Sequence, residues 1–236
     1  MLPSELFSAN ADFHGDLVRN IPGIRRSQNL FDDLSPDPDD WAVAVAAEQS
    51  GRIPTATAIA TRPFDYGSVI SYSFDASHWQ STRFSDGMHY GVWYGAPEVE
   101  TTVYETAHHW RRFLLDSYGE LDRLIVTDRR ICDVRCDALL IDLRGKHIEH
   151  PELIRRDSYA FTHQVGRMLH AQDLSGLLVK SARCEGITAA IFRAERLSNV
   201  REKMFATYKV NVVKDTFVAE RTRGKTWLSF APSTLE

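Results

Sequence analysis

The sequence predicts an α+β domain whose sheet is largely antiparallel and made of many short strands, with two main helices. Short segments rich in β-branched and aromatic residues recur from about residue 66 to residue 230. Two longer segments, at 97–116 and 158–170, instead carry apolar residues three and four positions apart. Residues 222–225 have the Thr-Arg-Gly-Lys pattern of a hairpin turn. Short strands interrupted by two helices are typical of the α+β class.

The first 58 residues differ in character and are predicted to form a partly helical appendage on a domain at 59–236. Residues 32–40 are acidic and punctuated by prolines, as in a loop that ends in a helix cap. Asp37 can cap a helix with Pro38 in its first turn, and this helix would continue through residues 41–48 and stop near Gly51.

Within the larger domain, residues 69–74 and 90–95 have the composition of strands. Pro97 can open the helix that runs to about Asp116. The apolar stripe of that helix is formed by Val99, Val103, Ala107, Trp110 and Leu114. We expect this stripe to face a sheet.

The rest of the larger domain is predicted to contain two more strands, a second helix and a final series of short strands. Residues 124–127 and 138–143 are predicted strands, and the helix at 158–170 is amphipathic through Phe161, Val165 and Leu169. The last predicted strands are short and lie at 176–180, 188–192, 205–210, 217–220 and 227–230.

Charge and hydropathy exclude several classes of protein. The 236 residues include 28 Lys and Arg against 32 Asp and Glu, a formal net charge of −4, so the broad positive field of a nucleic-acid-binding protein is absent. Hydrophobic residues make up 43%, enough for one substantial core. No stretch approaches the roughly 20 apolar residues of a membrane span, and the chain does not start like a secretory signal. We expect a cytoplasmic protein with no direct nucleic-acid or membrane partner.

The cysteines and the absence of common motifs exclude further classes of protein. Cys132, Cys136 and Cys184 are too few for a disulfide framework, and a lone C-x3-C pair is a poor zinc signature, so we expect reduced packing residues. The sequence has no P-loop, no G-x-G-x-x-G after a strand and no G-x-S-x-G elbow. Nucleotide hydrolysis by a Walker site, dehydrogenase chemistry and serine-hydrolase chemistry therefore have no motif support.

Three candidate site residues follow one another at intervals of eleven: Arg83, Tyr94 and Glu105. An arginine on a loop is commonly a solvated charge, and a tyrosine late in a strand is commonly a core ring. Glu105 is more informative, because it lies near the edge of a helix's apolar stripe. A carboxylate is costly to desolvate there unless a partner pairs with it.

A second interpretation uses the same helix. Glu105, His108 and His109 form an E-x-x-H-H pattern that places the carboxylate one turn from an imidazole, as in some metal sites. A second ligand set of this kind would be expected and is not found in the sequence. A metal-dependent enzyme is therefore kept only as an alternative.

At these residues the sequence resembles the RES domain proteins, a family named for an arginine, a glutamate and a serine. The resemblance covers roughly residues 60 to 195. It is carried by the R-F-x-x-G start at 83–87, the strand and turn at 92–96, the helix pattern at 100–105 and the V-K-S-A-R segment at 179–183. These motifs are short, but their order and separation together are specific for the family.

The resemblance implies a fold like that of the ADP-ribosyltransferase toxins. It also implies an enzyme that degrades NAD+ as its substrate, without another cofactor, and that acts as a toxin restrained by a cognate antitoxin protein. Water as acceptor would make it an NAD+ glycohydrolase, inorganic phosphate an NAD+ phosphorylase, and a protein side chain a protein ADP-ribosyltransferase. A non-enzymatic binding module with this fold is a further alternative.

The resemblance also assigns roles to residues. Glu105 would stabilise the oxocarbenium-like state in which the nicotinamide–ribose bond breaks. Arg83 would supply the planar donor fork for the pyrophosphate, and Tyr94 an aromatic face beside the nicotinamide ring.

Two substrate-binding residues complete the implied site. Ser181 matches the family's serine and could donate a hydrogen bond to the substrate or to Glu105. Arg62 lies where the family often has an arginine on its first core strand, although Pro63 follows it directly and removes a backbone donor.

Overall fold

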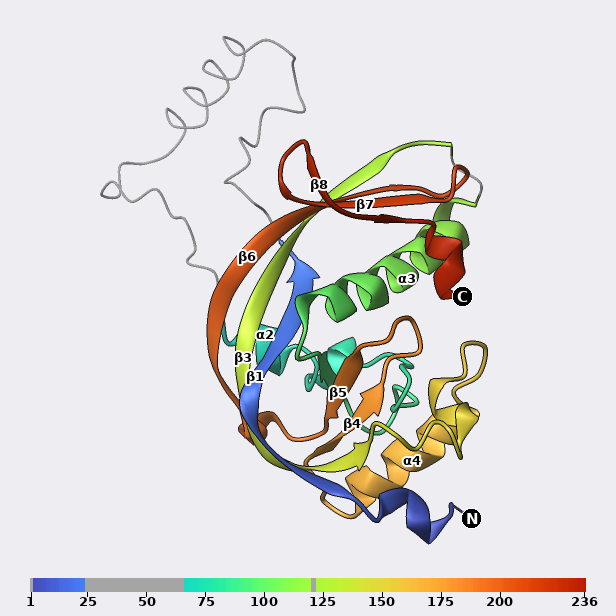
Figure 1. Cartoon of the computed structure of the whole chain (residues 1–236). Helices are drawn as coiled ribbons and strands as arrows, with labels where there is room; N and C mark the ends of the chain where they lie inside the picture. Colours follow the sequence, from blue (N-terminus) through green and yellow to red (C-terminus); the bar gives the residue numbers. More distant parts are fainter. Residues whose placement is uncertain (1, 24–65, 120–121) are drawn as a thin grey trace, which may run out of the picture.

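The computed structural model describes residues 2–23, 66–119 and 122–236, and these residues form one mixed sheet covered by two main helices (Figure 1). The strand order is β2 (Trp93–Gly95), β5 (Ile187–Ile191), β4 (Gly176–Lys180), β3 (Ile125–Leu143), β6 (Leu197–Asn211), β7 (Thr216–Thr222) and β8 (Lys225–Phe230), and β1 (Asn10–Pro22) pairs with β3 beside this path. All strand pairs are antiparallel except β3 with β4. The predicted α+β class, with a largely antiparallel sheet, is confirmed.

The central strand is β3 (Ile125–Leu143), which is much longer than predicted. It pairs with β1 (Asn10–Pro22) on one side and with β6 (Leu197–Asn211) on the other. The sequence predicted two strands here, at 124–127 and 138–143, because the residues between them are rich in Asp and Arg. In the second half of that link, from Cys132 to Asp137, every second residue is nevertheless apolar and buried, namely Cys132, Val134 and Cys136. The charged residues alternate with them, as in any strand with one buried face.

Residues 10–22 were expected in an appendage, but they belong to the sheet. β1 pairs with β3 over its whole length, and Leu17 and Val18 are buried. The predicted helix at 41–48 and the boundary at residue 58 lie outside the described residues.

One end of the sheet is a meander of β6, β7 (Thr216–Thr222) and β8 (Lys225–Phe230). The predicted turn at 222–225 is confirmed: Thr222 pairs with Lys225, and Gly224 has a φ of 79°, a conformation that glycine adopts without strain. β6 begins at residue 197, earlier than the predicted 205, so this strand is also longer than expected.

The other end carries β4 (Gly176–Lys180), β5 (Ile187–Ile191) and β2 (Trp93–Gly95). The strand predicted at 90–95 is reduced to the three residues of β2. The strand predicted at 69–74 is wrong, because this segment begins with the helical turn α2 (Ser68–Ser71). Backbone N–H groups of Ser71 and Tyr72 bond to carbonyls four residues earlier, and so no strand ladder forms there.

Both predicted helices are present as α3 (Val99–Tyr118) and α4 (Ala160–Ala171). In Figure 1 the long strands curve along one side of the molecule, with α3 above and α4 below. α3 buries Val103, Ala107 and Leu114 against β6 and β7, as its apolar stripe predicted. No helix in the described ranges is long and apolar enough to cross a membrane.

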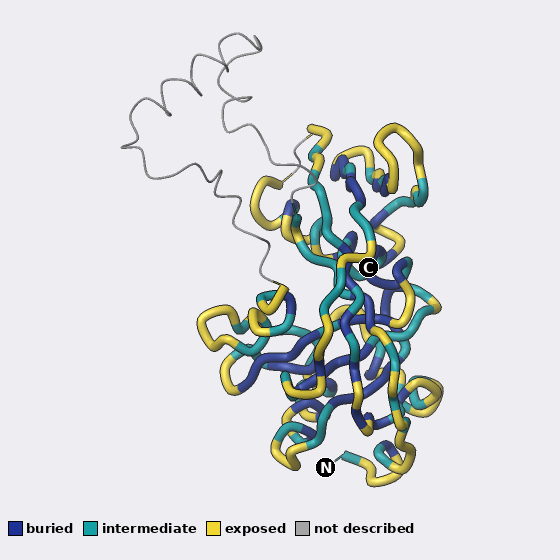
Figure 2. The backbone as a smooth tube through the Cα atoms, turned by 90° about the vertical axis from the view of Figure 1, so that its left-hand side faces the viewer, coloured by how far each residue is buried: buried dark blue, intermediate teal, exposed yellow. Residues whose placement is uncertain are grey.

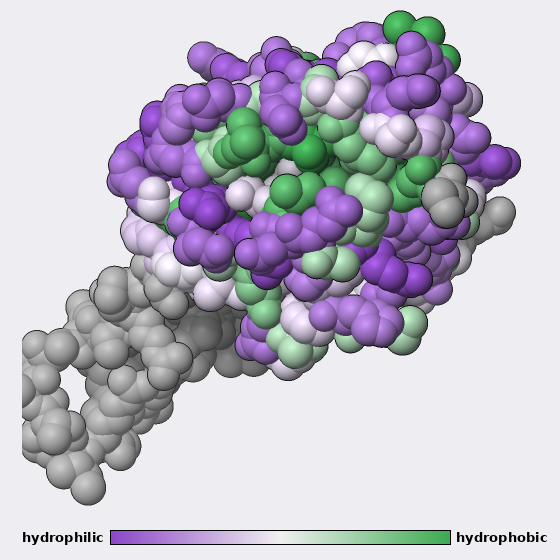
Figure 3. Space-filling model, turned by 90° about the horizontal axis from the view of Figure 1, so that it is seen from below, coloured by the Kyte–Doolittle hydropathy of each residue, from purple (hydrophilic) through white to green (hydrophobic). Residues whose placement is uncertain are grey.

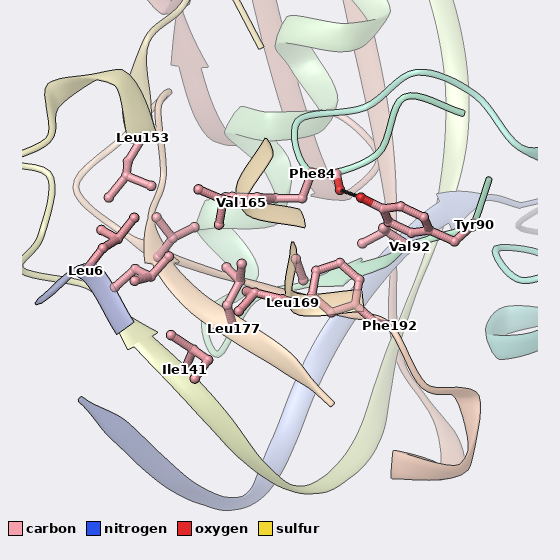
Figure 4. Close-up of a cluster of buried hydrophobic side chains, with 13 residues drawn as sticks. Leu6, Phe84, Tyr90, Val92, Ile141, Leu153, Val165, Leu169, Leu177 and Phe192 are labelled. Carbon is pink, nitrogen blue, oxygen red and sulfur yellow. Dashed lines mark hydrogen bonds between the residues drawn. The ribbon is translucent and has the colours of Figure 1, made fainter. Parts of the chain in front are cut away.

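The buried side chains form three clusters. In Figure 2 the buried residues (dark blue) lie mostly in the interior, and the exposed ones (yellow) are found mostly in the loops at the periphery. In one cluster Phe84 packs with Val165 and Leu169 of α4, and the Tyr90 hydroxyl donates to the Phe84 carbonyl at 2.8 Å (Figure 4). This packing fixes the loop next to Arg83. Seen from below, hydrophobic side chains gather in the middle of the face and hydrophilic ones surround them (Figure 3).

The three cysteines are free, as predicted. Cys132 and Cys136 are buried in the cluster between the sheet and α2, and burial raises the pKa of both thiols to about 11. Cys184 is only half-buried.

Candidate active site

A cavity of about 570 Å³ lies between β1, β2, α3 and the loop at 80–84. All three residues predicted from the eleven-residue spacing, Arg83, Tyr94 and Glu105, line it. The segments that carry them come together because β2 pairs with β5 at one edge of the sheet, while α3 starts directly after β2. Local sequence predicted these residues, but only the fold brings them to one cavity.

Glu105 is held by the predicted serine. Ser181 follows the end of β4, and its hydroxyl donates to Glu105 Oε1 at 2.6 Å. The hydroxyl oxygen of Ser181 also accepts from the backbone N–H groups of Arg183 and Cys184, at 3.0 and 3.3 Å. Because both acceptor positions of the hydroxyl are used, its hydrogen must point at the carboxylate. Among the described residues none donates to Glu105 Oε2, and this oxygen is free to act in the cavity.

Tyr94 anchors the arginine loop through its hydroxyl, a role that the sequence did not reveal. The hydroxyl accepts from the Phe84 backbone N–H at 2.9 Å and lies 2.9 Å from Thr82 Oγ1. Burial raises the pKa of Tyr94 to about 12, so the phenol stays neutral. Thr82 also bonds to His163 of α4 through its carbonyl, at 2.7 Å.

Arg83 stands on the turn that Tyr94 anchors. Its Nη1 donates to the carbonyls of Leu153 and Arg155, at 3.3 and 2.9 Å, and its guanidinium lies 5.0 Å from the centre of the Tyr159 ring. In the described part of the chain, no carboxylate comes within ion-pair distance of it. The guanidinium is thus oriented by neutral groups and keeps its charge for a ligand.

Arg62, the other predicted arginine, lies outside the described residues. On the first strand of the sheet, the arginine that lines the cavity is Arg19 of β1. Arg19 donates to the Tyr94 carbonyl at 2.6 Å and to Ser73 Oγ at 3.1 Å, and burial lowers its pKa to about 10. Arg19 was not predicted as a site residue because residues 10–22 were assigned to an appendage. The available signal was an arginine after the apolar pair Leu17-Val18.

A third arginine, Arg129 of β3, also lines the cavity and was not predicted. Its Nε donates to Asn20 Oδ1 at 3.0 Å and its Nη2 to the Asn20 carbonyl at 3.1 Å. Burial lowers its pKa to about 10, which still leaves it charged near neutral pH.

Only one of the two histidines of the E-x-x-H-H pattern lines the cavity. His109 lines the cavity with Glu105, and burial lowers its pKa. His108 is buried and does not line the cavity, and burial lowers its pKa to about 3. Among the described residues, no group of three or more His, Cys, Asp and Glu side chains is placed to hold a metal ion.

The last described residues brace the serine loop from outside. Arg183 donates to the Leu235 carbonyl at 2.7 Å, and Arg156 bridges the carbonyls of Ala182 and Thr234, at 3.1 and 3.2 Å. Arg111 of α3 pairs with Glu236. These contacts tie α3 and the Ser181 loop, which carry the Glu105–Ser181 pair, to one segment.

A family model described as the RES domain matches residues 49–210. A solved structure titled "Crystal structure of the M.tuberculosis MbcT-MbcA toxin-antitoxin complex" aligns over 91% of this chain and 96% of the other, with 10% sequence identity and a TM-score of 0.46. No curated protein matches.

Proposed function

The chain belongs to the RES domain family, and from this premise we propose that it is a toxin enzyme that consumes NAD+ by breaking the bond between nicotinamide and ribose. The observation that supports this most is the hydrogen bond from Ser181 to Glu105, in a cavity that also carries Arg83 and Tyr94. The pair provides an oriented carboxylate next to a fixed positive charge. This is the combination that glycosidic cleavage of an anionic nucleotide needs.

The proposed step begins as the bond from ribose C1′ to the nicotinamide nitrogen breaks and its electron pair leaves with the nicotinamide. Positive charge then develops on the ribose. Glu105 stabilises that charge through Oε2, while Ser181 holds Oε1 and prevents the side chain from turning away. The acceptor's oxygen bonds to C1′, and a proton from a water or hydroxyl acceptor can pass to Glu105.

Binding is assigned to Arg83 and the cavity walls. A volume of about 570 Å³ is within the usual range of ligand pockets. The guanidinium of Arg83 would hold the diphosphate of NAD+ with its free donors, and the ring of Tyr94 would line the nicotinamide side. Lining residues that belong to α3, Trp110 and Phe113, add apolar surface.

For the acceptor we propose water or inorganic phosphate, which correspond to glycohydrolase and phosphorylase activity. A protein acceptor would use the same cleavage step. A toxin of this kind would also need a neutralising antitoxin, for which we propose a protein that covers the mouth of the cavity.

Purified full-length protein incubated with NAD+, with and without phosphate, tests this function. Products are identified by mass, and we expect free nicotinamide with ADP-ribose or its phosphorylated form. Loss of NAD+ only when a target protein is added would favour the transferase. Intact NAD+ under all conditions would contradict the proposed activity.

Replacing Arg83 by lysine should raise the apparent KM for NAD+ by about tenfold. Lysine keeps the positive charge but loses the planar fork that positions a diphosphate, and hydrogen bonds to charged groups contribute roughly 1.5–3 kcal/mol. Steady-state kinetics with NAD+ measure the effect. Arg112→Lys, an exposed residue of α3 outside the cavity, is the matched control. An unchanged KM in Arg83→Lys would make Arg83 a surface charge.

Replacing Ser181 by alanine should lower kcat by about tenfold, with a smaller change in KM, because the carboxylate loses its orienting hydrogen bond. The backbone N–H groups of Arg183 and Cys184 also lose their acceptor, and so the melting temperature should fall. Ser181→Thr keeps the hydroxyl and should restore part of kcat. Full activity in Ser181→Ala would remove the serine from the site.

A further inference from the structure

Arg183 lies behind the Glu105–Ser181 pair, outside the cavity. It follows the serine by two residues, it is not among the residues that line the cavity, and 4% of its surface is exposed. No carboxylate of the described residues reaches ion-pair distance of its guanidinium. Nη1 instead donates to the carbonyl of Leu235 at 2.7 Å. Because burying a charge costs free energy, we expect this arginine to do more than fill space.

The main chain of Arg183 bonds directly to the pair. Its backbone N–H donates to the hydroxyl oxygen of Ser181 at 3.0 Å, and that hydroxyl donates to Glu105 at 2.6 Å. Since the N–H occupies one acceptor position of the hydroxyl, it directs the hydroxyl hydrogen toward the carboxylate. A shift of the Arg183 backbone would therefore weaken the bond from Ser181 to Glu105.

The carbonyl that accepts from the Arg183 side chain belongs to the short helix η5 (Pro232–Leu235), drawn in red beside the end of α3 in Figure 1. Leu235 is buried and belongs to the same hydrophobic cluster as Ala107 of α3. One turn later on this helix, Arg111 pairs with the residue that follows η5. The acceptor of Arg183 is thus fixed to the helix that carries the carboxylate of the pair.

A second arginine ties the start of the Ser181 loop, residues 181–186, to the same segment. Arg156 is an exposed residue. Its Nε donates to the Ala182 carbonyl at 3.1 Å, and its Nη1 donates to the Thr234 carbonyl at 3.2 Å. The two arginines therefore hold neighbouring residues of the loop against one short segment.

The other end of the Ser181 loop is fixed as well. The backbone N–H of Ser181 donates to the Gly186 carbonyl at 2.8 Å, which closes the loop between β4 and β5. Gly186 lies so near α3 that a Cβ at this position would be 1.9 Å from Thr101 Oγ1. Rotation of the Ser181 side chain is the main freedom that remains, and the N–H of Arg183 restricts it.

We propose that Arg183 is a positioning residue for the cleavage step. By binding the Leu235 carbonyl it keeps its own N–H on the Ser181 hydroxyl, and so keeps that hydroxyl on Glu105. The segment at 231–236, which does not line the cavity, thereby affects the rate of a reaction inside it. The effect on the rate rests on the proposed function, whereas the hold on the Ser181 loop does not.

Arg183→Met tests the effect on the rate, because methionine fills much of the space of the arginine stem but donates no hydrogen bond. We expect kcat for NAD+ to fall by about tenfold and KM to change by less than about twofold, since Arg183 does not line the cavity. Arg183→Lys can still donate to a carbonyl and should restore part of kcat. Arg112→Met makes the same change at an exposed position of α3 and should leave kcat unchanged.

A double-mutant cycle with Ser181→Ala separates positioning from a general loss of structure. If Arg183 acts through the Ser181 hydroxyl, Arg183→Met should lower kcat by less than about twofold once that hydroxyl is absent. A further loss of about tenfold in the double variant would show that the two residues act independently, and it would overturn the proposal. Melting curves establish that each variant is folded.

Hydrogen exchange measured by mass tests the hold without any substrate. The amides of residues 183 and 184 donate to the Ser181 oxygen and should exchange slowly in the unmodified protein. Peptides that cover 182–186 should exchange about tenfold faster in Arg183→Met and at the unmodified rate in Arg112→Met. If Arg183→Met does not fold, Arg156→Gln removes the second tie at an exposed position and should change kcat and exchange in the same directions.

Unchanged exchange in folded Arg183→Met overturns the proposal, and so does faster exchange with an unchanged kcat. If the unmodified protein does not consume NAD+, the proposed cleavage is contradicted, and exchange alone decides the hold on the loop. Faster exchange in Arg183→Met then supports that hold, and unchanged exchange overturns it.

Discussion

Glu105→Gln is expected to lower the rate of NAD+ consumption by on the order of a hundredfold or more and to leave the fold intact. The amide has nearly the same shape and can still accept the Ser181 hydrogen bond through its oxygen. It carries no negative charge, however, and cannot compensate the positive charge that develops on the ribose. The loss should therefore fall on kcat, with little change in KM.

Nicotinamide release measured by mass or absorbance tests this expectation. Glu100→Gln makes the same chemical change in the first turn of α3, where Glu100 pairs with Arg221 on the surface, and it should retain activity because exposed ion pairs contribute little. Near-normal turnover of folded Glu105→Gln would remove Glu105 from the catalytic role. Activity that disappears with a chelator and returns with a divalent ion would instead favour the metal interpretation of Glu105, His108 and His109.

Expression of the unmodified chain alone in a bacterial host is expected to arrest growth and lower cellular NAD+. An enzyme that consumes a cofactor every cell requires harms its host unless a partner blocks it. The Glu105→Gln variant should be harmless at the same expression level and should still bind an antitoxin, because the substitution is confined to the cavity. The partner's contact should be local, since a net charge of −4 provides no broad basic surface.

Colony counts and extracted NAD+ measure this effect, with both proteins brought to equal levels by immunoblotting. Growth arrest by Glu105→Gln as well would show that toxicity does not come from the cavity. Harmless expression of the unmodified chain with unchanged NAD+ would contradict the toxin role. The protein would then be either a transferase that modifies a specific target or an inactive member of the family.

Local sequence determined a large part of this protein. The three- and four-residue spacing from Val99 onward predicted α3, and the position of Glu105 on that helix followed from the same pattern. The Thr222–Lys225 turn was predictable because glycine is favoured where φ is positive. Arg83, Tyr94 and Ser181 were predicted because they belong to short sequence motifs that occur in a fixed order. Such motifs can be recognised without knowing which residues are neighbours in space.

Only the tertiary structure decided which distant residues meet. Ser181 donates to a carboxylate 76 residues earlier in the chain, and Arg129 binds Asn20 across 109 residues. β1 and the middle of β3 were missed because their charged residues resemble loops, while pairing between the two strands buries their apolar residues, such as Leu17 opposite Val134. Periodicity reports how a segment buries its own side chains. It does not report which segment supplies the other half of a hydrogen bond, and that partner decides whether an arginine is solvated or belongs to a site.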